Sequence, residues 1–504
     1  MGFLKKRAVF KKTKSQTSHS QIKLSPSLKE NREIFERHFD YQEDLIYRMF
    51  YMKQPDNRKC MLIFMKDITN QEWISQQIMQ PLKECEIDPI WLKKEGITSL
   101  EEFVLTSGNV SATDDVTMLF DELLSGNAIL LIQDETSALS ISVGEWASRA
   151  IEEPTTQTVV RGPREGFTEK LSTNKALLRK RIRTNKLKIE TFKLGEMTQT
   201  NVSLVFIQDL ADEEIVNEAR RRIQKIHIAG ILESNNIEEL IEDTKWTPFP
   251  LVSNTERPDV AAAALLEGKV IVMVDGTPFV LMVPVVFMQF FQTAEDYYSS
   301  VFVGSLTRLL RYLSMFIALL APSIYVALTT FHQEMIPSQL LTNIAAQREG
   351  VPFPAFIEAL LMEVTFEILR EAGIRMPKAV GQAVSVVGAI VIGQAAVEAG
   401  FVSAAMVIVV SATAIASFVL PSYNMANTIR LLRFFIMGLA ASFGFFGITL
   451  GLFLLIVHLC SLRSFGVSYM APIAPFYGQD QKDTFVRLRH TSFSFKGKLL
   501  RKKN

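Results

Sequence analysis

The stretch LSMFIALLAPSIYVALTTF, at residues 313–331, carries no charged side chain over 19 residues. At a rise of about 1.5 Å per residue, a helix of this length nearly crosses a hydrocarbon core of about 30 Å. Charged residues recur every few positions before about Tyr312, and they are sparse from Leu313 to Cys460. The sequence therefore predicts two dissimilar halves, a soluble N-terminal half and an all-α, polytopic membrane domain.

Three further apolar stretches extend the membrane half, at residues 380–397, 401–420 and 434–460. Small residues recur on the first and the last of them, including Gly381, Gly388, Gly444, Gly447 and Gly451. Small residues allow helix backbones to approach closely in lipid, so we expect these glycines at helix contacts, within the chain or between subunits. Pro322 interrupts the stretch 313–331, and a neighbouring helix must satisfy the backbone carbonyl that this proline leaves free.

A helix at residues 354–372 combines apolar and ionisable side chains. Phe356, Leu360, Glu363 and Glu367 fall on one helical face, at spacings of four, three and four residues. Because an ionised group near the bilayer centre costs at least a few kcal/mol, this helix cannot face lipid. Two interpretations stay open. The helix lies at the membrane surface or re-enters beside other helices, or it lines a pore in which carboxylates from several subunits form a cation pathway.

The number of spans is ambiguous from charge alone. Arg308 and Arg311 precede the stretch 313–331 and no secretory signal peptide occurs, so we expect the N-terminal half in the cytoplasm. Four spans place both basic tails on that side but put Arg430 and Arg433 outside. A fifth span at 354–372 instead places these two arginines inside and the basic C-terminal tail outside. We favour four spans, because the chain closes with seven basic residues.

The soluble half repeats itself at an offset of 142 residues. Residues 61–67 align with 203–209, and residues 123–132 align with 265–274. Each copy has a polar turn between two apolar strands, which is Asp275-Gly276 in the second copy. We therefore expect a duplicated α/β or α+β architecture, with subdomains at 31–158 and 186–305, before the membrane domain at 306–463.

A linker at residues 159–185 separates the two copies. It contains a turn motif and then a basic helix, and the motif consists of Arg161, Gly162, Pro163, Arg164, Glu165 and Gly166. The motif lacks the Gly-Lys-Ser/Thr ending of a phosphate-binding loop. The six histidines show no metal-ligand spacing and no nucleophile motif occurs, so we expect no enzyme activity, cofactor or metal.

The net charge of +1 gives no support for binding to nucleic acid. The two basic tails, at residues 1–30 and 464–504, are concentrated positive segments in an otherwise balanced chain. They are either solvated or in contact with anionic lipid on the cytoplasmic leaflet.

Several separated motifs closely resemble the GerA family of spore germination proteins. They lie at residues 161–169, 257–268, 275–278, 352–363, 375–378, 392–396 and 421–424. The resemblance covers about residues 30–477, and it implies the A subunit of a nutrient germinant receptor in the inner membrane of a bacterial endospore. It further implies two partners, a transporter-like B subunit and a lipoprotein C subunit.

The resemblance also implies a mechanism. The A subunit would form a homo-oligomer that releases monovalent cations when small nutrients are sensed, and on this hypothesis Glu363 and Glu367 line the pore. A non-conducting, membrane-anchored receptor or scaffold subunit is an alternative. A secondary transporter is a weaker one, because the membrane half shows no inverted repeat.

Overall fold

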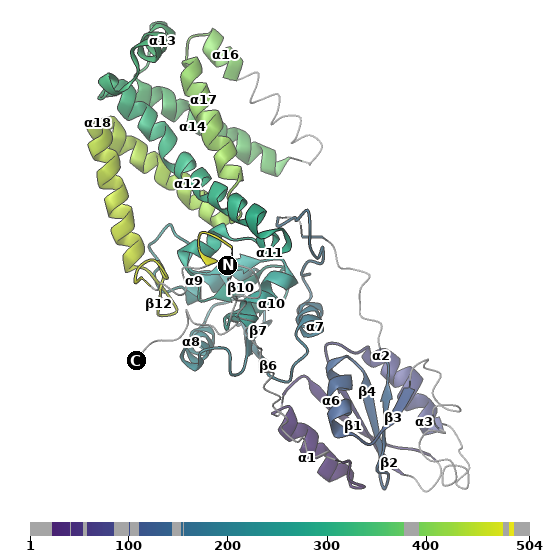
Figure 1. Ribbon diagram of the computed structural model, residues 1–504. Coiled ribbons are helices and arrows are strands. Elements are labelled where there is room, and N and C mark those ends of the chain that lie inside the picture. The colour runs from purple at the N-terminus through teal and green to yellow at the C-terminus, as the bar shows by residue number, and fades with distance from the viewer. Residues whose placement is uncertain are drawn as a thin grey trace, which may run out of the picture. The chain divides into compact units, whose positions relative to one another are not determined.

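A computed structural model describes residues 23–40, 42–53, 58–84, 100, 110–143, 153–154, 156–376, 393–476 and 483–487 (Figure 1). The chain divides into two compact units. One comprises residues 1–150 and 175–189, and the other comprises residues 151–174 and 190–504. Each unit is described below by itself.

The first unit contains a five-stranded sheet of order β1-β2-β4-β5-β3. Its strands are β1 Leu45–Tyr51, β2 Lys59–Met65, β3 Val110–Thr113, β4 Ala128–Ile132 and β5 Ala138–Ile141. Along β2, Met61 and Ile63 pack with α1 Leu28–His38 and α6 Val116–Leu124. Leu62 and Phe64 pack on the opposite face, with the short helices α2 Gln71–Ile74, η1 Ser75–Met79 and α3 Gln80–Glu84. Because both faces are covered, the central strands are apolar throughout rather than alternating.

A second five-stranded sheet has the equivalent order, β6-β7-β9-β10-β8. Its strands are β6 Leu187–Leu194, β7 Thr200–Ile207, β8 Ser253–Thr255, β9 Val270–Val274 and β10 Val280–Val283, and its helices are α8 Glu213–Gln224, α9 Ser234–Ile241 and α10 Pro258–Leu266. The helix α7 Leu171–Arg181 precedes β6, and its residues from Lys175 onward belong to the first unit. β9, β10 and α10 each lie 142 residues after β4, β5 and α6. The basic helix expected in the linker, α7, lies within one residue of this offset from α1. The mixed α/β N-terminal half is therefore confirmed, as two sheets of one topology.

The C-terminal half is helical. It comprises η2 Phe287–Phe291, α11 Glu295–Tyr298, α12 Val301–Thr330, η3 Gln333–Met335, α13 Ser338–Arg348, α14 Ala355–Arg375, α16 Gly393–Glu398, α17 Ala404–Phe418 and α18 Tyr423–Ser461, followed by the hairpin β11 Arg463–Ser464 and β12 Val467–Ser468. Among the described residues, α12 and α18 are long and apolar enough to cross a membrane, by length and composition. The expected stretch 401–420 corresponds to α17, which is apolar but shorter. Residues 380–392 of the expected stretch 380–397, with Gly381 and Gly388, lie outside the described residues.

The last stretch, 434–460, lies within α18, and α18 is not one straight helix. Gly444 has φ +59° and ψ −138°, which interrupts the helix and divides it into a first arm, 423–443, and a second arm, 445–461. Only glycine adopts this conformation readily. A Cβ atom on Gly447 would clash with the carbonyl oxygen of Leu439, so the two arms pack closely against each other. Gly451 faces Leu439 and Ile436 in the same way.

The helices run between two ends of this bundle. At the end that contacts the second sheet, here called the sheet end, Thr428 of the first arm donates to the Pro248 carbonyl, and His458 of the second arm lies 2.9 Å from Thr247 Oγ1. At the opposite end, here called the apex, His332 lies against Gly444. Figure 1 shows the two arms of α18 meeting there. Both arms therefore extend from the sheet end to the apex.

The helix at 354–372 corresponds to α14, which runs parallel to α17. Glu358 contacts Ser403 near the start of both helices, and the rings of Phe366 and Phe418 lie 6.4 Å apart near the end of α17. Both helices start at the apex, since the Ser403 hydroxyl lies 3.3 Å from that of Tyr325, close to the end of α12.

Candidate functional site

The charged helix α14 is a packed member of the bundle. Its buried face includes Ala359 and Met362, which lie in one apolar cluster with Val326 of α12, Met406 of α17 and Met437 of α18. The carboxylates of Glu358 and Glu363 on this face are fully buried. This face of the segment is therefore packed inside the helical bundle, and its interfacial or re-entrant placement in a membrane stays a prediction.

Glu363 is the centre of a contact among four helices. It pairs with Arg433 of the first arm of α18, and the two side chains are 0% and 1% exposed. Thr413 of α17 donates to Glu363 Oε1 at 3.2 Å, and Arg433 Nε donates to the carbonyl of Ala318 in α12 at 2.6 Å. Ala318 precedes Pro322 by four residues, so its carbonyl has no intrahelical donor. The expected partner for the carbonyl freed by this proline is thus a buried arginine.

A second ion pair lies one helical turn away. Glu367 Oε2 accepts a hydrogen bond from Arg430 at 3.4 Å and another from Arg370 at 2.9 Å. The carboxylates are four residues apart on α14, and Arg430 and Arg433 are three residues apart on α18, with the order reversed. The two pairs therefore hold these helices antiparallel in a fixed register. We call Glu363, Glu367, Arg430 and Arg433 the charge cluster.

The charge cluster lies deep within the bundle. Ala318 is 17 residues after the start of α12 and 12 residues before its end, which places it roughly 26 Å and 18 Å from the two ends. Among the described residues, the buried atoms Arg433 Nη2 and Glu367 Oε1 have no hydrogen-bond partner. The charge cluster therefore holds buried polar atoms without partners near the middle of α12.

The other carboxylates of α14 also have partners. Glu358 accepts hydrogen bonds from the backbone and hydroxyl of Ser403, the N-cap residue of α17, and its Oε2 lies 3.9 Å from Arg348 Nε. Glu371 pairs with Arg375 on the surface, where the side chains are 50% and 79% exposed. Along α14 the carboxylates therefore change from buried, at Glu358 and Glu363, to half-buried at Glu367 and exposed at Glu371.

The predicted pore residues occupy different environments. Phe356 and Leu360 are partly buried and pack on the apolar cluster around Val326. Glu363 is fully buried within this subunit, and its assignment to a pore lining stays a prediction. The outward face of α14 is apolar instead, with exposed Ile357, Leu361, Val364 and Ile368.

Arg430 and Arg433 are functional candidates that the sequence reasoning missed. Both entered it only as charges that the positive-inside rule could not place consistently. The available signal was a pair of arginines three residues apart in an apolar helix. It is matched by two carboxylates four residues apart in another helix. Because both arginines are paired with carboxylates, they give no information about membrane orientation.

The turn motif lies at the connection to the helical half. A Cβ atom on Gly162, whose φ is +141°, would lie 2.7 Å from the ring of Tyr298 in α11. Arg257 donates to the Pro163 carbonyl at 3.0 Å, and the Tyr298 hydroxyl donates to Asp259 at 2.5 Å. Of the remaining motif residues, Arg161 and Arg164 are exposed, Glu165 is partly buried and Gly166 is buried. The turn is thus held against α11, immediately before α12.

The start of α12 is fixed by a buried carboxylate. Asp296 is 1% exposed and accepts from Arg308 Nε at 3.2 Å and from Arg311 Nη1 at 2.8 Å. Arg308 also donates to the carbonyl of Asp483 near the C-terminus. The arginines expected to flank the membrane are therefore engaged within the protein.

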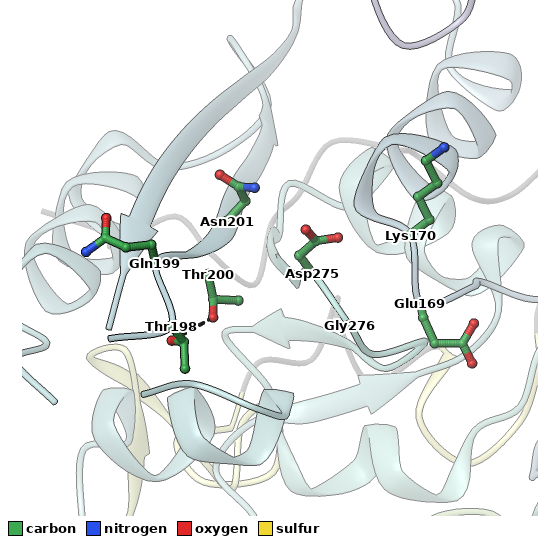
Figure 2. A pocket seen from close by; sticks show the side chains of 8 residues that line it. All are labelled: Glu169, Lys170, Thr198, Gln199, Thr200, Asn201, Asp275 and Gly276. Atoms are coloured by element: carbon green, nitrogen blue, oxygen red, sulfur yellow. Dashed lines mark hydrogen bonds between the residues drawn. The ribbon is translucent and has the colours of Figure 1, made fainter. Parts of the chain in front are cut away.

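A shallow pocket of about 440 Å³ lies at one end of the second sheet (Figure 2). Its lining is polar and consists of Glu169, Lys170, Thr198, Gln199, Thr200, Asn201, Asp275 and Gly276. Asp275 Oδ1 accepts from the backbone of Leu171 at 3.0 Å, and the Gly276 N–H donates to the Glu169 carbonyl at 2.8 Å. These groups connect the turn to the start of α7, so the pocket is a structural junction. The described residues contain no cluster of three or more side chains suited to hold a metal.

Residues 33–498 match the family described as Bacillus/Clostridium GerA spore germination protein. Spore germination protein KA of Bacillus subtilis (strain 168) is 47% identical to this chain, over 94% of this chain and 86% of that protein. The uncharacterized membrane protein YfkQ of the same organism is 44% identical, over 92% of this chain and 89% of that protein.

A solved structure, the N-terminal domain of the A subunit of the Bacillus megaterium spore germinant receptor GerK3, is 32% identical, with a TM-score of 0.40. It covers 54% of this chain and 100% of that domain. The family match and the similarity to the two full-length relatives each extend over most of the sequence. The chain therefore belongs to the Bacillus/Clostridium GerA family of spore germination proteins.

Proposed function

We propose that this protein is the membrane-embedded A subunit of a spore nutrient germinant receptor, and that its helical half forms or gates a path for monovalent cations. The buried charge cluster is the observation that carries the proposal. Four ionisable side chains from α14 and α18 meet inside an apolar bundle. Ionisable groups at that depth are costly in a membrane, and in membrane proteins they mark ion pathways more often than simple anchors.

The directions of the helices support a multi-pass arrangement. α12 runs from the sheet end to the apex, α14 and α17 run back, and the two arms of α18 run out and back. Among the described residues, five segments thus run between the two ends, and the chain enters and leaves the bundle at the sheet end. In this proposal the sheet end faces the cytoplasm, or core, of the spore.

The charge cluster has a different role here from the one expected. Glu363 holds α14 on α12, α17 and α18, and it does not line an open channel in this conformation. Gating would move α14 relative to Arg433, and the apolar outward face of α14 would contact neighbouring subunits or lipid. The transporter-like B subunit and the lipoprotein C subunit are the proposed partners in nutrient sensing.

The test uses spores that carry the full receptor. Potassium release after nutrient addition is measured for wild type, Glu363→Gln/Glu367→Gln and the exposed control Glu371→Gln. We expect the double variant to lose or deregulate release and the control to behave as wild type. Normal release by a double variant present at normal abundance would refute the role of these carboxylates.

A non-conducting scaffold subunit is the second candidate, and the attachment of the bundle to the second sheet favours it. The hairpin after α18 docks there through Ser464, whose hydroxyl donates to the Leu251 carbonyl at 2.7 Å. A scaffold requires this attachment but not the charge cluster. Normal potassium release by the double variant would therefore favour the scaffold.

A further inference from the structure

Trp246 is the most exposed large apolar side chain among the described residues, with 95% of its surface accessible. A single exposed apolar residue on a mobile loop requires no explanation. The loop around Trp246, however, is firmly held. Thr247 contacts His458, the Pro248 carbonyl accepts from Thr428, and Phe249 is buried. The indole is therefore held outward by a rigid segment.

The surroundings of Trp246 change from apolar to charged. The second arm of α18 exposes Phe446, Phe453, Ile456 and Val457, and this apolar surface ends at His458, the partner of Thr247. Beyond it Arg463 is exposed, and Lys245 is exposed next to Trp246, while the nearby Asp243 is paired with Arg222. A membrane interface has the same order, in which an apolar helix surface is followed by an indole and then by basic side chains.

We infer that Trp246 inserts into the headgroup and upper acyl region of the bilayer, and that it docks the second α/β subdomain on the membrane surface. The indole buries its apolar body while its N–H stays in reach of polar headgroups. Lys245 and Arg463 would then face anionic lipid. This inference rests on the membrane placement in the proposed function, and it adds a contact by which a soluble subdomain is fixed to the bilayer.

The experiment measures the depth of the indole in the full-length protein. Trp73, Trp91 and Trp146 are replaced by Phe, which leaves Trp246 as the only tryptophan, and the protein is reconstituted in vesicles of phosphatidylcholine and phosphatidylglycerol. Nitroxide lipids labelled near the headgroup or deep in the acyl chain, and aqueous acrylamide, serve as quenchers. We expect a larger loss of fluorescence with the shallow nitroxide than with the deep one, and protection from acrylamide. The difference in signal between wild type and Trp246→Phe gives the same information if the triple replacement disturbs folding.

Two reporter variants separate the possible failures, each in a background with no other tryptophan. Phe453→Trp lies on the exposed face of the second arm and should be quenched by the deep nitroxide. Met197→Trp is exposed at the end of the second sheet remote from the helices, and it should be quenched by acrylamide alone.

Strong acrylamide quenching of Trp246, without nitroxide quenching, would overturn the inference. Protection of Trp246 from all quenchers would also overturn it, because a protein partner rather than lipid would cover the indole. If Phe453→Trp is not quenched by either nitroxide, the membrane placement itself fails.

Discussion

Replacing Glu363 by Gln leaves the guanidinium of Arg433 buried, with the Ala318 carbonyl as its remaining charge-compensating contact. Removing one partner of a buried ion pair costs about 3–5 kcal/mol, because the other charge is left uncompensated. Glu371→Gln is the matched control, since it removes a carboxylate from the same helix. Its partner Arg375 is 79% exposed, and we expect a cost of about 0–1 kcal/mol.

The double variant Glu363→Gln/Arg433→Met removes both charges. Replacing a whole buried pair is often close to neutral, but the Ala318 carbonyl then lacks a donor, which costs about 1–3 kcal/mol. The double variant should therefore be more stable than Glu363→Gln alone. The free energy of unfolding is measured on purified protein in detergent, by titration with sodium dodecyl sulfate and circular dichroism. The reasoning would be refuted by equal losses of unfolding free energy in Glu363→Gln and Glu371→Gln. It would also be refuted by a double variant that is no more stable than Glu363→Gln alone.

Three further predictions concern the kink, the second subdomain and the start of α12. Gly444→Ala should destabilise the protein by about 1–3 kcal/mol, because residue 444 has φ +59° and an added Cβ would meet His332. In the control Gly438→Ala the added Cβ meets nothing within 4 Å, so this variant should be neutral or stabilising. Thermal unfolding compares the two variants. Burial, together with Glu242 and Glu233, raises the pKa of Glu238 to about 7 from an ordinary 4.5. The folded state therefore holds this proton more tightly, and stability that is complete below pH 4.5 falls by roughly 3 kcal/mol as pH rises to about 7. Glu238→Gln should remove that part of the pH dependence and raise stability at pH 8, as denaturant titrations across this range can check. Asp296→Asn should cost about 1–3 kcal/mol, because the fully buried Arg308 loses one carboxylate and keeps Asp483, and faster proteolysis after residue 298 would report loosening of α12.

The duplicated α/β half could be predicted from the sequence because its signal is local. Apolar strands such as residues 270–274 stand between charged helices, and the constant offset of 142 residues identifies both copies. The turn at Asp275 and Gly276, between the apolar strands β9 and β10, is part of the same local pattern.

The helical half was predicted less well, because its decisive contacts are long-range. Gly444 reads as one more small residue in an apolar run, and only its φ shows that the helix ends there. Glu363 and Arg433 are 70 residues apart, so a single sequence shows two unpaired charges where the structure has one ion pair. Pro322 was more informative, because the missing N–H of a proline always requires a partner for the carbonyl four residues earlier.

Conductance of the purified protein in planar lipid bilayers, alone and with the co-expressed B and C subunits, tests the central claim most directly. The account predicts discrete monovalent cation currents that respond to nutrient in the assembled receptor. It also predicts that Glu363→Gln/Glu367→Gln alters these currents and that Glu371→Gln does not. A correctly assembled receptor with no cation current, or with currents indifferent to Glu363 and Glu367, would contradict it.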